Sequence, residues 1–245
     1  MTKQRTKSNK SLWVLLGCAL LLRLMLALVT DGYPYDMSCF VAWGDKLASE
    51  GPAAFYSADY FADYPPGYIL VLGLVSLVRK ALQLSYESRW TYFLLALIPA
   101  ICDCAAVVLL DHISRRDMGQ GRAQRCLVLF AAFCPLTLFD TGIWKQIDGA
   151  FALPLLLCFW LLEERRYLLA AVLYGVALAI KPQALLAGPV LAVCFLVAIA
   201  DAVRDGKSPL KSVGQIFGGA ALALLPPLLA GLPFYGAKNL LPSLV

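Results

Sequence analysis

Charged residues are scarce in this sequence: Asp, Glu, Lys and Arg make up only 15% of its 245 residues. A soluble domain carries about 25%, so this composition does not fit a soluble fold. Histidine occurs once, at His112, which excludes a zinc site with several histidines and argues against a Ser-His-Asp triad. Internal repeats and low-complexity tracts are also missing. We expect neither a metal nor another cofactor.

Hydrophobic residues, in contrast, make up 60% of the chain and recur in runs close to the roughly 20 residues that cross a bilayer. The sequence therefore predicts an all-α, polytopic membrane protein, organised as a single membrane module over residues 1–245. The first run follows a basic N-terminus but contains Arg23 and no small-residue cleavage site, so we expect it to be retained as a span. The seven predicted spans are 12–29, 90–110, 126–143, 149–162, 167–180, 183–200 and 213–234.

A further apolar run at 67–84 is short, and we expect it to lie at the interface rather than to cross. With a cytoplasmic N-terminus, thirteen Lys and Arg residues then fall in cytoplasmic segments and seven on the opposite face. If 67–84 crossed, the two faces would carry equal numbers, so the positive-inside rule favours the first arrangement. Segment 30–88 becomes a long external loop with interfacial helices, and the C-terminus is external. In a bacterium this would be a plasma-membrane protein.

The net charge of +5 comes from these short basic loops, so we do not expect nucleic acid as a partner. Seven of the eight cysteines lie in apolar runs or begin one, and Cys39 alone lies in a polar segment. We interpret them as small buried hydrophobic residues rather than a disulfide framework.

The predicted topology brings polar side chains together on the external face. Acids of the long loop would lie there with the turns "DTGIWKQIDG" at 140–149 and "IKPQ" at 180–183. In "FADYPPGY" at 61–68, the double proline would fix the chain where it re-enters the membrane. Arg23 and Asp103 lie inside apolar spans, where charges are usually paired or functional, and we predict that they form a structural pair.

Four motifs in this order resemble the GT-C superfamily of membrane glycosyltransferases. The most similar patterns are the lipid-linked-sugar glucosyltransferases of asparagine-linked glycosylation and bacterial relatives of the second mannosyltransferase of GPI-anchor synthesis. The resemblance covers about residues 12–200. It rests on "GYPYDMSCFVAWGDKLASEGPAAFY" with the following "DYPPGY", on "PAICDCAAVVLL", on "GIWKQIDGAF" and on "LYGVALAIKPQALLAGP".

The resemblance implies transfer of a hexose, mannose or glucose, from a polyprenyl-phosphate sugar to a glycan, lipid or protein acceptor at the extracytoplasmic face. It also implies that an acid of the first external loop, here Asp36, is the general base. Family members normally continue beyond residue 245, so we expect this chain to be an N-terminal portion. The predicted substrate-binding residues are Asp63, Tyr64, Lys145, Gln146, Asp148, Lys181 and Gln183.

Each candidate also has a plainer interpretation. Asp36 would be the N-cap of a helix beginning after it, and Asp31 is a competing base. Asp148 would cap the next span, and Asp63 would anchor the re-entry turn. The lysines would extend to the lipid headgroups. Four aromatic residues would either stack on a sugar or belt the membrane interface: Trp43, Tyr56, Tyr64 and Trp144.

Two other functions fit the same spans. A transporter or flippase of a lipid-linked sugar would share the external acids, but such proteins often show two related halves or broken helices near the midplane. The polar residues here gather on the external face instead, which favours an enzyme. A non-catalytic membrane assembly subunit is the second alternative, because the chain is short.

Overall fold

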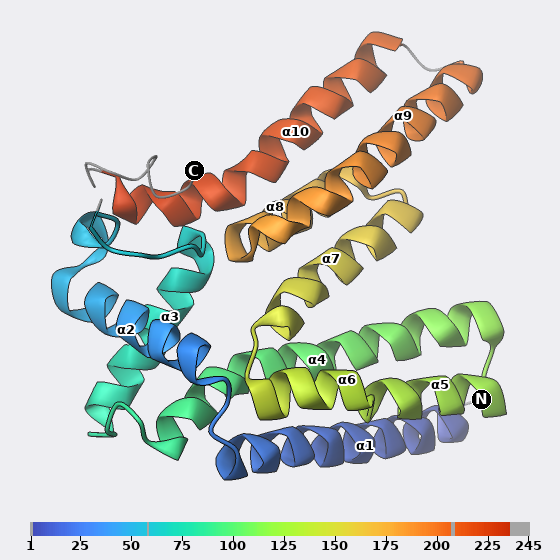
Figure 1. Cartoon of the computed structure of the whole chain (residues 1–245). Helices are drawn as coiled ribbons and strands as arrows, with labels where there is room; N and C mark the ends of the chain where they lie inside the picture. The colour runs from blue at the N-terminus through green and yellow to red at the C-terminus, as the bar shows by residue number, and fades with distance from the viewer. Residues whose placement is uncertain (1, 58, 207–208, 236–245) are drawn as a thin grey trace. The chain divides into compact units, whose positions relative to one another are not determined.

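The computed structural model describes residues 2–57, 59–206 and 209–235, and these residues form helices and connecting loops with no strand. The C-terminal segment from residue 236, predicted to be external, lies outside the described residues. The elements are α1 Thr2–Val29, α2 Pro34–Glu50, η1 Pro52–Ala54, α3 Pro66–Ala81, α4 Arg89–Met118, α5 Arg122–Ala132, α6 Pro135–Thr137, η2 Leu138–Trp144, α7 Asp148–Glu163, α8 Tyr167–Ile180, η3 Pro182–Ala187, α9 Gly188–Arg204, α10 Pro209–Gly231 and η4 Leu232–Phe234 (Figure 1).

The predicted all-α membrane fold is confirmed by the length and composition of these helices. Within the described residues, five helical segments are long and apolar enough to cross a bilayer, and Tyr167–Ile180 is a shorter apolar helix. The predicted span at 149–162 falls within α7, and the total of seven spans stays a prediction. The five segments are Lys10–Val29, Arg89–Met118, Arg122–Trp144, Pro182–Arg204 and Phe217–Phe234.

The chain divides into two compact units. Unit 1 comprises Met1–Val41 and Val78–Leu153, and unit 2 comprises Ala42–Leu77 and Pro154–Val245. Helices α2, α3 and α7 continue from one unit into the other.

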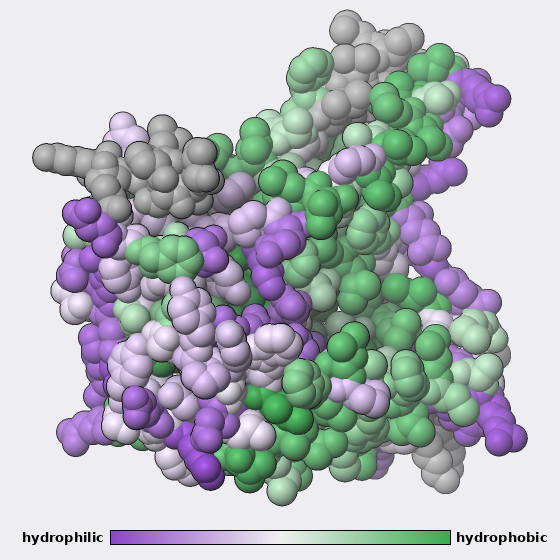
Figure 2. All heavy atoms as spheres, in the orientation of Figure 1, coloured by the Kyte–Doolittle hydropathy of each residue, from purple (hydrophilic) through white to green (hydrophobic). Residues whose placement is uncertain are grey.

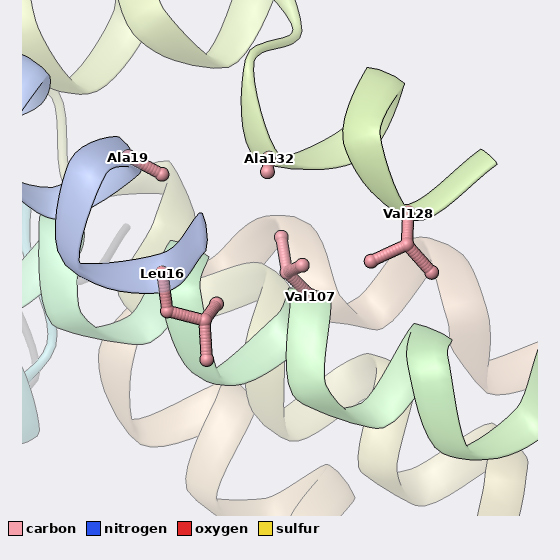
Figure 3. Close-up of a cluster of buried hydrophobic side chains, with 5 residues drawn as sticks. All are labelled: Leu16, Ala19, Val107, Val128 and Ala132. Carbon is pink, nitrogen blue, oxygen red and sulfur yellow. The ribbon is translucent and has the colours of Figure 1, made fainter. Parts of the chain in front are cut away.

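Unit 1 is built on a bundle in which α1 packs along α4, and the segment α5–α6–η2 packs beside both (Figure 1). Figure 3 shows the buried contact of the bundle, where small and branched side chains from the three elements meet. Burial of such side chains stabilises the bundle by about 25 cal/mol per Å² of apolar surface. The cluster consists of Leu16, Ala19, Val107, Val128 and Ala132.

Large apolar side chains also cover the outside of unit 1. On α1, Trp13 and Val14 are each 67% exposed, which would be unfavourable in water but suits a lipid solvent. Figure 2 shows hydrophobic residues over α1, α4 and α5, whereas hydrophilic residues gather over α2. The surface therefore agrees with a bundle that crosses a membrane.

Unit 2 is organised around α8 and α10, which pack extensively along each other. Gly175 of α8 lies against the backbone carbonyl of Ala223, so a side chain there would collide with α10. The second half of α2 packs as tightly on α3, where a Cβ on Gly44 would lie 2.6 Å from the Leu72 carbonyl oxygen.

The cysteines differ from the expectation in one respect. None of the eight forms a disulfide, which agrees with the prediction, but only Cys158 is fully buried. Cys18 and Cys126 are exposed, so the expectation of uniformly buried thiols is wrong. Both lie in segments long and apolar enough to cross a membrane, where an exposed thiol would face lipid.

Candidate functional site

Asp36 lies in the first turn of α2, close to the end of α1. The last turn of α1 is closed by Thr30, whose Oγ1 donates to the Leu26 carbonyl at 2.8 Å. Helix α2 begins at Pro34, a residue suited to the first helical position because it has no N–H to leave unpaired. Asp36 is therefore inside the helix and not the N-cap that precedes it, which removes the capping alternative. Its carboxylate lies instead near the partial positive charge of the helix N-terminus.

The segment that faces Asp36 follows a π-helical turn. Such turns are frequent at functional sites. Helix η2 ends at Trp144, and Lys145 adopts a left-handed conformation with φ 66° that reverses the chain. The Gln146 backbone N–H then donates to the Asp140 carbonyl at 3.0 Å. In this conformation Gln146 Nε2 donates a hydrogen bond to Asp36 Oδ2, which joins two predicted site residues that are 110 positions apart.

Lys145 is enclosed beneath this contact. Its side chain is fully buried, and Nζ donates to the Thr30 carbonyl at 2.9 Å, to Thr30 Oγ1 at 2.7 Å and to the Ile143 carbonyl at 3.4 Å. Burial lowers the pKa of Lys145 to about 8; the nearby Asp31 opposes this change and Arg89 adds to it. The ammonium group thus ties the end of α1 to the end of η2 and is not a mobile surface charge.

Close packing at Gly32 explains how Lys145 and α2 fit together. Gly32 has φ 75°, a conformation that L side chains rarely adopt. A Cβ on this residue would lie 2.9 Å from Met37 Cγ and 3.2 Å from Lys145 Cδ. Glycine here lets the α1–α2 connection pass over the lysine stem, and this places Asp36 beside Gln146.

Contacts at the exposed edge, or rim, of the site distinguish the two candidate bases, Asp31 and Asp36. Asp31, the competing base, is exposed and pairs with Arg89 of α4 at 3.3 Å. Trp144 is 40% exposed, and its ring packs edge-on against Tyr33 with the centroids 5.9 Å apart. The rim therefore offers an accessible aromatic face close to Asp36, while the carboxylate of Asp31 already has a cationic partner.

Asp148 is the first residue of α7 and also belongs to unit 1. The next residue, Gly149, packs so closely on α4 that a Cβ would lie 2.5 Å from Asp103 Oδ1 and 2.7 Å from the Pro99 carbonyl oxygen. This contact fixes the first turn of α7, and with it the position of Asp148. Its place at a helix N-terminus fits both a capping role and a substrate contact.

The other four predicted residues lie in unit 2. Asp63 is exposed and Tyr64 is half-buried in the loop before α3, while Lys181 and exposed Gln183 lie where α8 passes into η3. Gly67 packs directly on the Ala179 carbonyl, so the "DYPPGY" turn lies against the C-terminal end of α8. Unit 2 thus brings its four candidates to one junction.

Two aromatic residues that were candidates for stacking on a sugar are buried supports of this loop. Trp43 Nε1 donates to the Phe61 carbonyl at 2.9 Å, and the Tyr56 hydroxyl donates to the Tyr64 carbonyl at 2.8 Å. Burial raises the pKa of Tyr56. Both rings are almost inaccessible, so neither can stack on a sugar. Tyr64 remains partly accessible, with its ring 5.4 Å from that of Trp43.

Sequence reasoning missed the part played by two threonines and the π-helical turn. Thr30 Oγ1 accepts a hydrogen bond from Lys145 Nζ, and Thr141 Oγ1 donates one to Asp103 Oδ2 at 2.7 Å. A threonine at the end of an apolar run gives little signal of its own. The extra residue in a π turn leaves no compositional mark, so the left-handed Lys145 could not be anticipated.

The described residues contain no group of three or more His, Cys, Asp or Glu side chains that could hold a metal ion. Among known proteins, the sequence model of glycosyltransferase family 87 matches residues 61–240. The match begins after Asp36 and includes the other seven predicted substrate residues. It agrees with the expected class of activity, but the family is neither of the two relatives that the motifs resemble. No curated protein matches the chain.

Proposed function

Since the chain belongs to glycosyltransferase family 87, we propose that it transfers a hexose from a polyprenyl-phosphate sugar to a glycan, lipid or protein acceptor at the extracytoplasmic membrane face, with Asp36 as general base. The observation that carries the proposal is the hydrogen bond from Gln146 to Asp36 at one end of the unit 1 bundle. It joins the carboxylate to a turn that also carries the buried Lys145 and the partly exposed ring of Trp144.

The reaction needs one proton acceptor and one stabilised leaving group. The acceptor hydroxyl oxygen attacks the anomeric carbon, the bond from that carbon to the phosphate oxygen breaks, and polyprenyl phosphate leaves with the bonding electrons. The hydroxyl proton passes to Asp36. Gln146 holds Oδ2 of the carboxylate, so Oδ1 can point to the acceptor. Asp31 is less suited because its carboxylate already pairs with Arg89.

Positive charge near the leaving phosphate would stabilise the transition state. Lys145 directly precedes Gln146 and has a pKa of about 8, so it is mostly protonated at neutral pH. We assign Lys145 two roles: it supplies a fixed positive charge at the site, and it orients Thr30 and Gln146. Lys181, at the end of α8, is the candidate for direct phosphate contact. Asp63, Tyr64, Asp148 and Gln183 are candidates for contacts with sugar or acceptor hydroxyls.

The depth of the site supports a lipid-linked donor. Thr30 directly follows the candidate span Lys10–Val29, and Lys145 directly follows Arg122–Trp144. A polyprenyl phosphate carries its charge at the headgroup plane, which is the level at which spans end. A water-soluble nucleotide sugar would have no need of a site at this depth.

Transfer can be measured with the purified full chain in lipid nanodiscs. We would supply radiolabelled polyprenyl-phosphate mannose or glucose with a membrane extract as acceptor source, and count label in glycan, lipid and protein fractions. The proposal expects transfer from at least one of the two donors and none after Asp36→Asn. Transfer from a nucleotide sugar alone would contradict the donor assignment, and transbilayer movement of the donor without transfer would favour the transporter alternative.

The side of the membrane needs a separate test. In a background without cysteine, Trp144→Cys should react with an impermeant maleimide added to intact cells, and Gln120→Cys should react only after the cells are opened. Labelling of position 120 from outside would reverse the topology and move the site to the cytoplasmic face.

A further inference from the structure

Unit 1 has a second polar feature at the end opposite Asp36. A cavity of about 600 Å³ opens there between α1, α4 and α5. Ser11 lines it and Thr30 marks the Asp36 end, and the helical rise along α1 separates the two by about 28 Å. The cavity therefore lies at the other membrane surface and takes no part in the glycosyl-transfer site. Its lining residues are Ser11, Leu12, Leu15, Asp111, Arg115, Gln120, Gly121, Gln124, Arg125, Val128 and Leu129.

The polar wall of this cavity is held in place by a buried network. Asp111 is only 7% exposed and accepts hydrogen bonds from Gln124 Nε2 and from Arg115 Nε, each at 2.7 Å. Gln124 is 3% exposed. The Gln124 bond links α5 to α4, and the Arg115 bond, within α4, fixes the Arg115 guanidinium along the wall. A pre-oriented arginine loses little side-chain freedom when it binds an anion.

The charge of the lining favours an anion. Arg115 and Arg125 are two cations against the single carboxylate of Asp111, which already pairs with Arg115. The start of α5 adds to this preference, because Gly121 provides no side-chain cap for the first backbone N–H groups. A metal ion or a cationic ligand would be repelled by the same wall.

Part of the lining is apolar. Leu12 and Leu15 of α1 and Val128 and Leu129 of α5 lie beside the arginines. A free inorganic anion gains nothing from such a surface, whereas an amphiphile can place its phosphate on the arginines and the start of its chains on the leucines. The basic loop 111–125 is also the part that the charge count places in the cytoplasm, where the leaflet carries anionic lipids.

We propose that this cavity binds the phosphodiester headgroup of an anionic phospholipid. Arg115 and Arg125 would contact the phosphate, and the apolar part of the lining would receive the glycerol backbone and the first methylenes of the acyl chains. Basic pockets between membrane helices on the cytoplasmic side are suited to such headgroups. The lipid would join α1, α4 and α5 at the end of the bundle where loop 119–121 connects two of them.

Lipid binding to the purified full chain can be counted by native mass spectrometry during titration with phosphatidylglycerol. Phosphatidylcholine is the neutral comparison, and Arg125→Gln is the test variant because Arg125 is exposed and its loss should leave the fold intact. Arg116→Gln is the matched control: it removes the same charge from α4, but Arg116 pairs with Asp117 and does not line the cavity.

We expect phosphatidylglycerol to bind more tightly than phosphatidylcholine at one site. Arg125→Gln should raise its dissociation constant about fivefold, the effect of one arginine near an anionic headgroup. Arg116→Gln should change it less than twofold. Equal effects of the two substitutions, or equal affinity for both lipids, would overturn the proposal. Binding of one inorganic phosphate that Arg125→Gln abolishes, without tight binding of phosphatidylglycerol, would assign the cavity to free phosphate instead.

Discussion

Arg23 Nε lies 3.0 Å from Asp103 Oδ2 inside unit 1, and the arginine is only 1% exposed. Arg23 also donates to the Ala132 carbonyl at 2.8 Å and to Thr137 Oγ1 at 2.9 Å. Helix α5 ends at Ala132, and the carbonyls of a last helical turn have no partner within the helix. Arg23 therefore also links the end of α5 to α6. These elements lead to the segment that carries Gln146.

The first prediction concerns this pair. Asp103→Ala should lower the free energy of unfolding by roughly 2–3 kcal/mol, because it leaves a buried guanidinium without its carboxylate. Arg23→Ala should have a similar effect, and the double substitution should be less harmful than the sum of the two. Thermal unfolding of the four proteins in detergent gives the coupling. Purely additive losses would show that the two side chains do not stabilise each other.

The Arg23–Asp103 contact also shows what the sequence can and cannot predict. Charges inside apolar runs are costly unless they are paired, so composition and spacing alone point to this contact. The same patterns predict the helices and the apolar surface. The partners Thr137, Thr141 and Ala132 could not be predicted, because they depend on where the third span breaks into α5, α6 and η2.

The candidate site illustrates the same limit. A carboxylate after the first span and the turn "WKQIDG" indicate a polar site, but not that Gln146 is the residue that contacts Asp36. That contact depends on the left-handed conformation of Lys145 and on a helix that begins at Pro34. The burial of Trp43 and Tyr56 could not be predicted from the sequence either, because an aromatic residue at the membrane interface and a buried one have the same sequence signature.

The second prediction tests the packing of the "DYPPGY" turn. Gly67→Ala would place a Cβ against the Ala179 carbonyl, which can move away only if α3 and α8 separate. We expect a loss of roughly 1–3 kcal/mol in unfolding free energy, and weaker substrate binding if the junction carries Lys181 to the substrate.

Gly17→Ala is the matched control for this substitution. No atom lies within 4 Å of a Cβ there, and Gly17 is in a helix, where alanine is favoured by up to about 1 kcal/mol. The thermal unfolding midpoint should therefore fall for Gly67→Ala and stay the same or rise for Gly17→Ala. Equal midpoints would mean that α3 does not pack tightly on α8.

The third prediction is a pH dependence from Lys145. Its pKa is about 8 in the folded chain, against 10.5 for an ordinary lysine. Between these values the unfolded chain binds more protons than the folded one, so stability rises with pH through this window, by up to about 1.4 kcal/mol per pH unit. Below pH 8 both states are protonated and the penalty for burying the charge is constant. Lys145→Met should remove this rise.

The measurement is the thermal unfolding midpoint at several values between pH 8 and pH 10, compared between wild type and variant. Lys80→Met, which removes an exposed lysine of α3, serves as the control and should keep the wild-type slope. The comparison of slopes separates the titration from the loss of the Thr30 hydrogen bonds, which lowers stability at every pH. The same slope in all three proteins would contradict a depressed pKa.

The fourth prediction concerns the general base. Asp36→Asn should lower the rate of sugar transfer by about 10²–10⁴-fold, because an amide cannot accept the proton of the attacking hydroxyl. Asparagine keeps the size of the side chain and an oxygen that can accept the hydrogen bond from Gln146, so folding and donor binding should change little.

Asp31→Asn is the control: it removes the competing acid, which pairs with Arg89, and should leave turnover near wild type. Gln146→Ala should fall between them, with about a tenfold lower rate and unchanged donor affinity, if Gln146 only orients the carboxylate. Single-turnover transfer and donor binding by filter assay separate these effects. Wild-type turnover in Asp36→Asn, with a large loss in Asp31→Asn, would move the base to Asp31 and make the Gln146 contact structural.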